Sequence, residues 1–307
     1  TIQVDDLSPV TRITPLAEGV ARERQAVSVT DAPKMFEGAG FEVRRAFQGI
    51  DLRLADPFLL LDHMGAVEYA PGEAKGAPDH PHRGFETVTY MLDGLMRHED
   101  STGTGGTLTP GGVQWMTAGR GIVHSEMPQQ EDGLMRGFQL WVNLPSAEKM
   151  CVPRYQNLEP DEIPRVDGDG GVHIRVIAGD VGGVSGAIYG VAVKPIYLDI
   201  RLPVETEHLQ PIPDGHTALC YVFEGAIAIV NSTDSVADGS AVDVPHHTLA
   251  VLGGGEAVRL QAGPEGGRTL LIAGKPLSEP VVRYGPFVMN TRDEIEQTIH
   301  DYRVGRF

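Results

Sequence analysis

Residues 80–94 read HPHRGFETVTYMLDG, and this stretch decides the expected fold class. Its middle, residues 85–92, is rich in the β-branched and aromatic residues that favour strands. Asp93-Gly94 is a dipeptide typical of a two-residue type I′ turn, and residues 95–98 follow it directly. The sequence therefore predicts a β-hairpin formed by residues 85–92 and 95–98.

The rest of the chain has the same β-rich character. It contains 38 glycines and 22 prolines, and turn residues separate its short apolar runs. Further strands are expected at residues 137–142, 172–177, 189–200, 218–230 and 269–273. One helix is expected near the C-terminal end, where Thr291 and Glu294 form a capping box. Ile295, Ile299 and Tyr302 then share one helical face, so that we predict an all-β protein with a C-terminal helix.

An internal repeat indicates two domains. A shift of 131 residues places YMLDG (90–94) on YVFEG (221–225), and it also places Leu140 on Leu271 and Pro145 on Pro276. Between the copies, residues 150–171 are rich in proline, glycine and acidic residues, as in a linker. We expect two antiparallel β-barrels, residues 1–158 and residues 159–307.

Length and composition exclude several classes of protein. The 307 residues suffice for two buried cores, and two cysteines are too few for a disulfide scaffold or a four-cysteine zinc site. The formal net charge of −17 argues against direct binding to nucleic acid, which needs basic groups that displace counterions. No run approaches the roughly 20 apolar residues of a membrane span, and the first residues lack the features of a secretory signal. We expect a soluble, cytoplasmic protein that contacts neither nucleic acid nor membrane directly.

Two short motifs carry the expected chemistry. His80 and His82 precede the strand at residues 85–92, and His124 and Glu126 follow later in the same half. Side chains at positions i and i+2 of an extended chain point to the same side, so that each pair forms a two-pronged clamp. Three imidazoles and one carboxylate that converge inside a barrel are costly to bury without a cation. The residues therefore predict a site for one divalent metal ion.

The motif residues also resemble a known family. Residues 80–94 follow the first cupin motif, in which H-x-H is followed by a glutamate (Glu86 here) and by a glycine that ends a strand. The segments HPHRGFETV (80–88), QWMTAGRGIVHSEMP (114–128), GFQLWVNLP (137–145) and GPFVMNTRDEIEQTI (285–299) resemble the pirins, a bicupin family. The resemblance covers most of residues 40–307 and implies a metal held by three histidines and a glutamate.

Two carboxylates compete for the fourth ligand position. A cupin in general would use Glu86, whereas the resemblance to pirins implies the glutamate two residues after the third histidine, which is Glu126 here. We choose Glu126. Glu86 is then expected either to orient a ligating imidazole or to be a solvated strand residue.

Other residues are expected near the metal or in the wall of its pocket: Glu86, His63, Gln114, Trp115, Met116 and Phe138. Core packing is the default expectation for Met116 and Phe138, with the pocket wall as the alternative, and His63 is expected to form hydrogen bonds rather than to be a fifth ligand. In the second barrel, the shift of 131 puts Pro211, Pro213, Gly255 and Ala257 at the four ligand positions. None of these side chains binds metal, so that the second barrel is expected to be structural.

The ligand set predicts a working metal centre rather than a closed structural one. Four protein ligands leave one or two positions of the metal open, and the lack of a thiolate favours ferrous iron, with manganese, nickel, cobalt, copper and zinc still open. The resemblance to bacterial pirins implies a quercetin 2,3-dioxygenase activity. In that reaction a flavonol loses its 3-hydroxyl proton and binds the metal, and O2 cleaves the heterocycle with release of carbon monoxide. Glu126 is the expected proton acceptor.

A second class of function stays open. Pirins also resemble metal-dependent regulators that bind a transcription factor or a metabolic enzyme and respond to the oxidation state of iron. An enzyme needs a substrate-sized pocket open to the metal for an enolic or aromatic molecule and O2, whereas a regulator needs only an enclosed metal and a surface for its protein partner. A structural bicupin that binds metal adventitiously is the third alternative.

Overall fold

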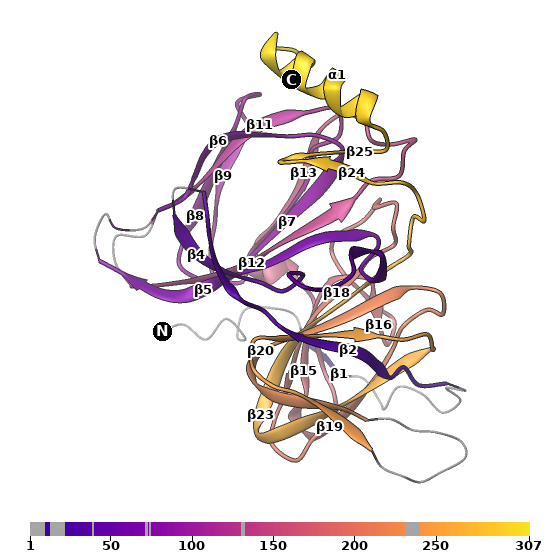
Figure 1. Ribbon diagram of the computed structural model, residues 1–307. Coiled ribbons are helices and arrows are strands. Elements are labelled where there is room, and N and C mark those ends of the chain that lie inside the picture. Colours follow the sequence, from indigo (N-terminus) through magenta and orange to yellow (C-terminus); the bar gives the residue numbers. More distant parts are fainter. Residues whose placement is uncertain are drawn as a thin grey trace.

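The computed structural model describes residues 10–12, 22–38, 40–70, 73, 75–129, 133–230 and 240–307. The described chain is mostly β-strand, with α1 (Arg292–Arg303) at its C-terminal end (Figure 1). It forms two halves that consist mainly of β-strands, as predicted for a bicupin. No helix among these residues is long and apolar enough to cross a bilayer.

The N-terminal half contains two facing sheets. Within the described residues, the larger sheet has the order β13 (Arg154–Leu158), β10 (Val113–Thr117), β7 (Phe85–Asp93), β12 (Gly133–Asn143), β5 (Phe58–Tyr69), β4 (Phe41–Arg45) and β3 (Lys34–Glu37). The smaller sheet has the order β6 (Ala77–His82), β11 (Ile122–Pro128), β8 (Met96–Asp100) and β9 (Gly105–Leu108). No ladder joins the two sheets among these residues, so that the predicted barrel is an open sandwich.

The C-terminal half is built around one large sheet. Its described order is β1 (Val10–Arg12), β14 (Arg165–Asp167), β15 (His173–Ala178), β18 (Ile196–Leu202), β23 (Ala257–Gly274), β20 (Thr217–Val230), β22 (Thr248–Leu252) and β2 (Ala26–Asp31). β19 (Glu207–Pro211) pairs with β23, and β21 (Ala241–Val244) pairs with β20. Two short ribbons follow in this part of the sequence: β16 (Asp180–Val181) with β17 (Val184–Ser185), and β24 (Val282–Tyr284) with β25 (Phe287–Met289). Short 3-10 turns lie at Leu52–Leu54, Pro160–Glu162 and Asp169–Gly171.

Segments from each end of the chain cross to the other half. β2 pairs with β22 of the C-terminal sheet. In return, the β24–β25 ribbon and α1 lie against the N-terminal sandwich, where Phe287 bridges to Arg83 (Figure 1). The boundary at residues 158 and 159 stays a proposal. It separates the two large sheets along the chain but does not describe the segments that cross.

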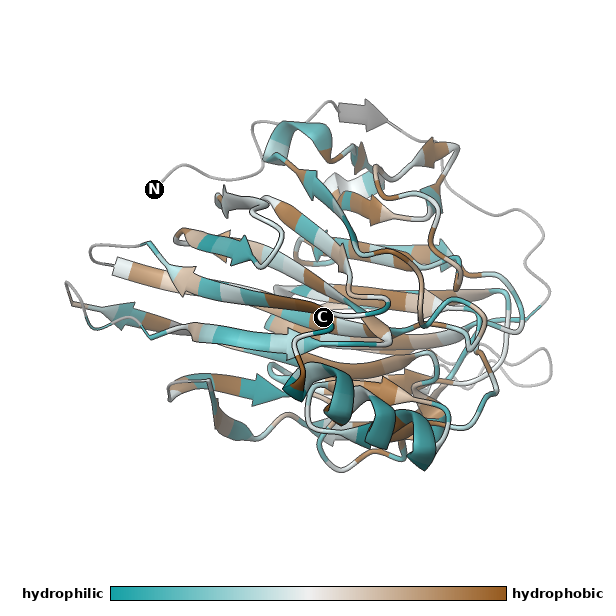
Figure 2. Cartoon of the chain, turned by 90° about the horizontal axis from the view of Figure 1, so that it is seen from above, coloured by the Kyte–Doolittle hydropathy of each residue, from teal (hydrophilic) through white to brown (hydrophobic). Residues whose placement is uncertain are grey.

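The C-terminal helix follows its sequence signals. The Thr291 side chain accepts a hydrogen bond from the Glu294 backbone, and the Glu294 side chain accepts one from the Thr291 backbone, which confirms the capping box. Ile295 is buried against Phe287 and Met289. Figure 2 shows that the rest of α1 is largely hydrophilic, as expected for a helix that buries one face.

Three local expectations were wrong. β7 pairs with β10 and β12, whereas β8 pairs with β11 and β9, so that residues 85–98 are a corner between two sheets and not a hairpin. A type I′ turn needs a positive φ at both central residues, but only Gly94 (φ 81°) has one among Asp93 and Gly94. Residues 189–195 form turns before β18 rather than the start of a strand. Residues 150–171 contain β13 and β14, one in each large sheet, and are not an unstructured linker.

The repeat is present in the topology, but its offset is not constant. β7 lies between β10 and β12, and β20 lies in the same way between β22 and β23. Tyr90 pairs with Val113 and Phe138, while Tyr221 pairs with Leu249 and Leu270. The equivalent strands are therefore offset by 131 (90 to 221), 136 (113 to 249) and 132 (138 to 270) residues. The two large sheets pack against each other through one shared hydrophobic core.

Candidate metal centre

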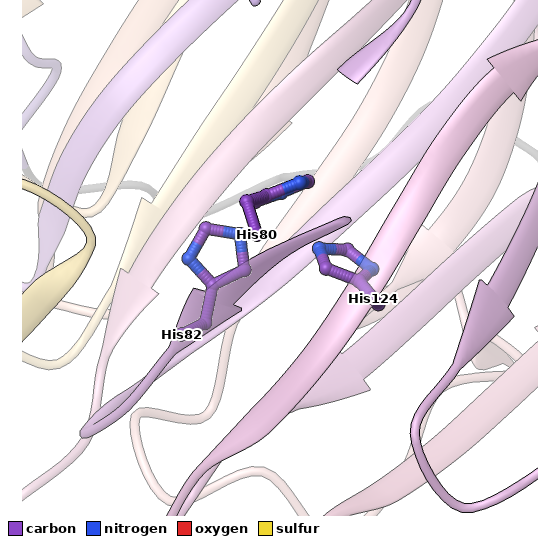
Figure 3. Close-up of side chains that lie close together, drawn as sticks. All are labelled: His80, His82 and His124. Atoms are coloured by element: carbon purple, nitrogen blue, oxygen red, sulfur yellow. The ribbon is translucent and has the colours of Figure 1, made fainter. Parts of the chain in front are cut away.

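Two paired strands of the smaller N-terminal sheet bring the three predicted histidines together. β6 and β11 are antiparallel, with His124 opposite His80 and Ile122 opposite His82. One ring nitrogen from each of His80, His82 and His124 lies within 4.8 Å of the other two (Figure 3). The same-side rule for positions i and i+2 therefore holds for the H-x-H motif.

The chemistry of these side chains fits a metal ion. His82 and His124 are 2% and 1% exposed, and none of their four ring nitrogens has a hydrogen-bond partner among the described residues. The Pro286 carbonyl is near enough to oppose the fall in the pKa of His82, but it makes no hydrogen bond of normal geometry. Buried nitrogens without partners are costly, and coordination to a cation removes that cost.

The protonation state of the cluster also suits a metal. Burial lowers the pKa of His124 to about 4, although the nearby Glu126 carboxylate opposes the shift. Burial likewise lowers the pKa of His82 well below its usual value, and the His124 ring adds to this. Both rings are therefore neutral at pH 7, which is the form that binds a metal. The His80 Nδ1–H donates a hydrogen bond to the Pro78 carbonyl at 2.8 Å, which directs the ring.

Glu126 lies beside the cluster on β11 and is 7% exposed. Its two carboxylate oxygens accept hydrogen bonds from the Thr89 hydroxyl (2.9 Å) and the Gln139 amide (2.7 Å). Burial opposes its ionisation, but His124, His80 and these two hydrogen bonds hold its pKa below the usual value. Among the described residues, the group whose possible ligand atoms all lie within 4.8 Å of one another holds the three histidines and does not include Glu126. Each oxygen keeps a further lone pair, and Glu126 as fourth ligand stays a proposal.

Glu86 does not reach the histidines. Its neighbour Phe85 packs on His82 with ring centroids 5.1 Å apart, and Thr89 contacts Glu126, so that odd-numbered residues of β7 face the cluster. Glu86 points to the opposite side of the strand, where the Thr117 hydroxyl donates to it at 2.6 Å. The same-side rule fails between His82 and Glu86 because the chain bends at Gly84, whose φ is 88°. Glu86 is buried rather than solvated, and it is not placed to orient an imidazole.

The other residues expected in the pocket wall lie elsewhere. His63, Trp115 and Phe138 belong to the face that packs on the C-terminal half, and His63 is hydrogen-bonded as expected, through Nδ1 to the Tyr221 hydroxyl at 3.2 Å. Gln114 donates to Asn157. Met116 packs with Ala118 and Ile122.

A cavity of about 590 Å³ opens beside the cluster between the two N-terminal sheets. His80, His82 and Glu126 border it, and its walls include Asp62, Met64, Gln139 and Trp141. Asp62, Met64 and Gln139 are sequence neighbours of His63 and Phe138, so that β5 and β12 do line the cavity but with the opposite face, whereas β10 does not line it. Arg283, Gly285 and Pro286 from the C-terminal ribbon complete the wall, and no local sequence signal predicts their arrival there.

One buried histidine near the site was also missed. His98 lies opposite Glu126 in the β8–β11 ladder and is 2% exposed. The position of His98 in the sequence does not predict that it lies near the metal site, because its neighbour across the sheet is known only from the fold. In the described part of the C-terminal half, no comparable group of metal-binding side chains occurs, and branched apolar residues fill the interior.

Comparisons with known proteins identify the family of the chain. The sequence profile of the family described as Pirin matches residues 40–142, and that of the Pirin C-terminal cupin domain matches residues 197–307. Pirin of Homo sapiens is 47% identical over 269 residues, which cover 87% of this chain and 88% of that protein. A pirin-like protein of Caulobacter vibrioides is 45% identical over 285 residues, with 92% and 99% coverage.

Solved structures show the same fold. A quercetin 2,3-dioxygenase from Acinetobacter baumannii has a TM-score of 0.84 at 36% identity and covers 93% of this chain and 98% of its own. A bacterial pirin from Escherichia coli in complex with nickel(II) has a TM-score of 0.59 at 19% identity, with 81% and 98% coverage, and shows the fold alone. Two family profiles and full-length relatives establish that this chain belongs to the pirin family of bicupins.

Proposed function

We propose that the protein is a metal-dependent dioxygenase that cleaves the ring of a flavonol or a similar enolic substrate, with ferrous iron as its metal. The observation that carries the proposal is the cavity of about 590 Å³ that borders His80, His82 and Glu126. Its volume lies in the range of small-molecule sites. The similarity to solved quercetin 2,3-dioxygenases supports the reaction class.

His80, His82, His124 and Glu126 would hold the metal. When bound, ferrous iron supplies a Lewis acid for an enolate oxygen and one-electron chemistry with O2. Glu126 would accept the proton of the substrate hydroxyl at a carboxylate oxygen, because its lowered pKa keeps it ionised. The hydrogen bonds from Thr89 and Gln139 fix the direction of that carboxylate.

The rest of the cavity would hold the substrate and keep water away. Met64, Met96 and Met135 form an apolar wall on the side of the larger sheet and β8. Flexible thioether side chains adapt to planar rings and make favourable contacts with them. Trp141 provides a flat surface next to His82, with ring centroids 5.4 Å apart.

The test is oxygen uptake and carbon monoxide release after quercetin is added to protein loaded with iron under anaerobic conditions. Glu126→Gln should keep most of the iron and lose turnover by at least about 100-fold, since general-base catalysis contributes that much. Glu86→Gln is the matched control, because its side chain lies on the opposite face of β7, and it should turn over normally. A metal-loaded, active Glu126→Gln enzyme would remove the base role.

The alternative function, a redox-sensing regulator, makes a different prediction. A regulator has no need of a small-molecule cavity at its metal, so that the open cavity favours the enzyme. Iron-loaded protein that consumes no oxygen with quercetin or other enolic compounds would favour the regulator.

A further inference from the structure

The C-terminal ribbon brings a cation into the wall of the metal cavity. Arg283 lies on β24, far from the cupin motifs in the sequence. Its guanidinium carbon is 4.5 Å from the centre of the Trp141 ring, and Trp141 in turn packs on His82 and on Phe85. One aromatic side chain therefore separates the guanidinium from the histidine cluster.

Arg283 differs from the other arginine of the cavity in its partners. Arg45 is held by Asp62, with bonds of 2.9 and 2.6 Å, and by Glu37 at 2.5 Å. Arg283 donates from Nε to the Gly285 carbonyl at 3.2 Å. No carboxylate of the described chain forms a salt bridge with it, and Asp62 and Glu37 act on it only through space. Its two terminal amino groups are therefore available to a ligand.

The electrostatics of the cavity also favour an anion there. The partial burial of the guanidinium and the nearby Arg45 lower the pKa of Arg283, while Asp62 and Glu37 oppose the shift, and the residue as a whole remains exposed to solvent. The charged residues in the wall are three basic and four acidic: Arg45, Lys75, Arg283, Glu37, Asp62, Asp79 and Glu126. A bound divalent cation makes the sum positive, although the whole chain carries −17. An anionic group at Arg283 completes the charge balance and forms the bidentate contact that a guanidinium prefers.

We propose that Arg283 determines specificity by binding an anionic group on the substrate. The substrate class is a planar conjugated acid. Its enolic oxygens face the histidine cluster, its rings lie between Trp141 and the methionine wall (Met64, Met96 and Met135), and its carboxylate or other anion pairs with Arg283. This inference rests on the proposed function, since it takes the cavity to be the substrate site.

The experiment compares two probes that share the same enolic rings. Quercetin and quercetin-5′-sulfonate are titrated calorimetrically into zinc-loaded protein without oxygen, so that binding is measured without turnover. We expect the sulfonate to bind about tenfold more tightly than quercetin, because a charge-assisted contact is worth that factor. In Arg283→Gln this advantage should vanish while the affinity for quercetin changes less than about threefold. Arg283→Lys should restore part of the preference for the sulfonate, since lysine keeps the positive charge but cannot form the bidentate contact of a guanidinium.

Two variants serve as controls for charge. Lys75→Gln removes another cation from the cavity wall, and Arg303→Gln removes one from α1, outside the cavity. Both should keep the preference for the sulfonate, and all variants should keep the zinc content of the wild type. An unchanged preference in Arg283→Gln, or a loss of the preference in Lys75→Gln instead, would overturn the assignment.

The same titrations separate this inference from the proposed function. Tight binding of the sulfonate with no oxygen uptake by the iron-loaded protein would contradict the dioxygenase and leave the role of Arg283 intact. Oxygen uptake with equal affinities for the two probes would leave the dioxygenase intact and overturn the role of Arg283. Failure of both probes to bind would contradict both.

Discussion

Glu86 stands where a cupin in general has a metal ligand, but here burial shifts the pKa of its carboxyl without any contact to the histidine cluster. Burial raises its pKa to about 7, although the Thr117 hydroxyl donates to the carboxylate and opposes the shift. A carboxyl whose pKa is higher in the folded state than in the unfolded state holds its proton more tightly when folded. The stability of the protein should therefore fall as the pH rises from about 4.5 to about 7 and remain lower above that window.

Glu86→Gln should remove this pH dependence. The amide does not ionise, so the variant should match the wild type near pH 4 and exceed its free energy of unfolding at pH 8 by as much as about 3 kcal/mol. Urea titrations at the two pH values measure the difference. Equal gains at both pH values would show that the effect is not ionisation, and a loss of bound metal would return Glu86 to the metal site.

His124 and His63 provide a second contrast between two buried histidines. His124→Ala removes one of the three imidazoles of the cluster. Because only two imidazoles then remain to bind the metal, its affinity should fall by more than tenfold. His63→Gln alters a ring stacked on Phe138 at the interface between the halves and should leave the metal content unchanged. Metal analysis after dialysis against a weak chelator measures both. Equal losses would mean that the metal binds elsewhere.

The sequence predicted the grouping of the histidines because the i, i+2 rule acts within one strand. His80 and His82 lie on β6, and no other part of the chain is needed to place them on one side. The same rule failed for Glu86, since Gly84 reverses the face between β6 and β7. For Phe138 the rule decides nothing, because the sequence does not show which face of β12 the cavity uses.

At the scale of the elements, the C-terminal ribbon is fastened to the N-terminal sandwich at one crowded point. The ammonium of the buried Lys149 donates to the carbonyls of Gly84 (2.8 Å) and Val288 (3.0 Å). A Cβ atom at Gly84 would lie 2.0 Å from the Val288 carbonyl oxygen. Next to it, the buried Arg83 pairs with Asp301 of α1 at 2.9 Å. The ribbon that carries Arg283 is therefore held beside the residue that follows His82.

Gly84→Ala should loosen this attachment, and Gly103→Ala is its matched control. Both glycines have positive φ, 88° and 84°, so that both substitutions carry a similar backbone cost. Open space surrounds Gly103, whereas Gly84 has the Val288 backbone in contact. We expect Gly84→Ala to lose at least about 2 kcal/mol more stability than Gly103→Ala, as backbone clashes do. It should also expose the segment after residue 275 to limited proteolysis, and equal protection in both variants would contradict the attachment.

The elements that the sequence predicted well are those with local signals. α1 begins at Arg292, directly after its N-cap Thr291, as expected. β24 and β25 are three residues each and owe their place to Arg83 and Lys149, which lie far away in the sequence. The false hairpin at Asp93-Gly94 has the same origin, since the partner of each strand lies elsewhere in the chain.

At the scale of the whole molecule, the two halves exchange equivalent hydrogen bonds. Tyr90 and Tyr221 occupy the same place in the two large sheets, and so do His63, opposite Phe138, and Asp199, opposite Leu270. The Tyr90 hydroxyl donates to Asp199 at 2.6 Å, and the Tyr221 hydroxyl bonds His63 at 3.2 Å. Each bond therefore runs from one half to the other, related by the pseudo-symmetry of the repeat. The shift of 131 residues pointed to this symmetry, but insertions between strands hid the equivalence of His63 and Asp199.

The two bonds should differ in strength because their acceptors differ in charge. Asp199 is buried and remains ionised, since Arg268 bonds it at 2.9 and 2.7 Å and holds its pKa below the usual value against the effect of burial. Burial lowers the pKa of His63, so that its ring is neutral. Tyr90→Phe should cost about 2 kcal/mol of unfolding free energy and Tyr221→Phe about 1 kcal/mol, as for hydrogen bonds to a charged and a neutral group. Urea unfolding followed by fluorescence and by circular dichroism measures both variants, with metal content as the control for the intact site. A larger loss in Tyr221→Phe would mean that the neutral pair, and not the charged one, fixes the two halves of the molecule together.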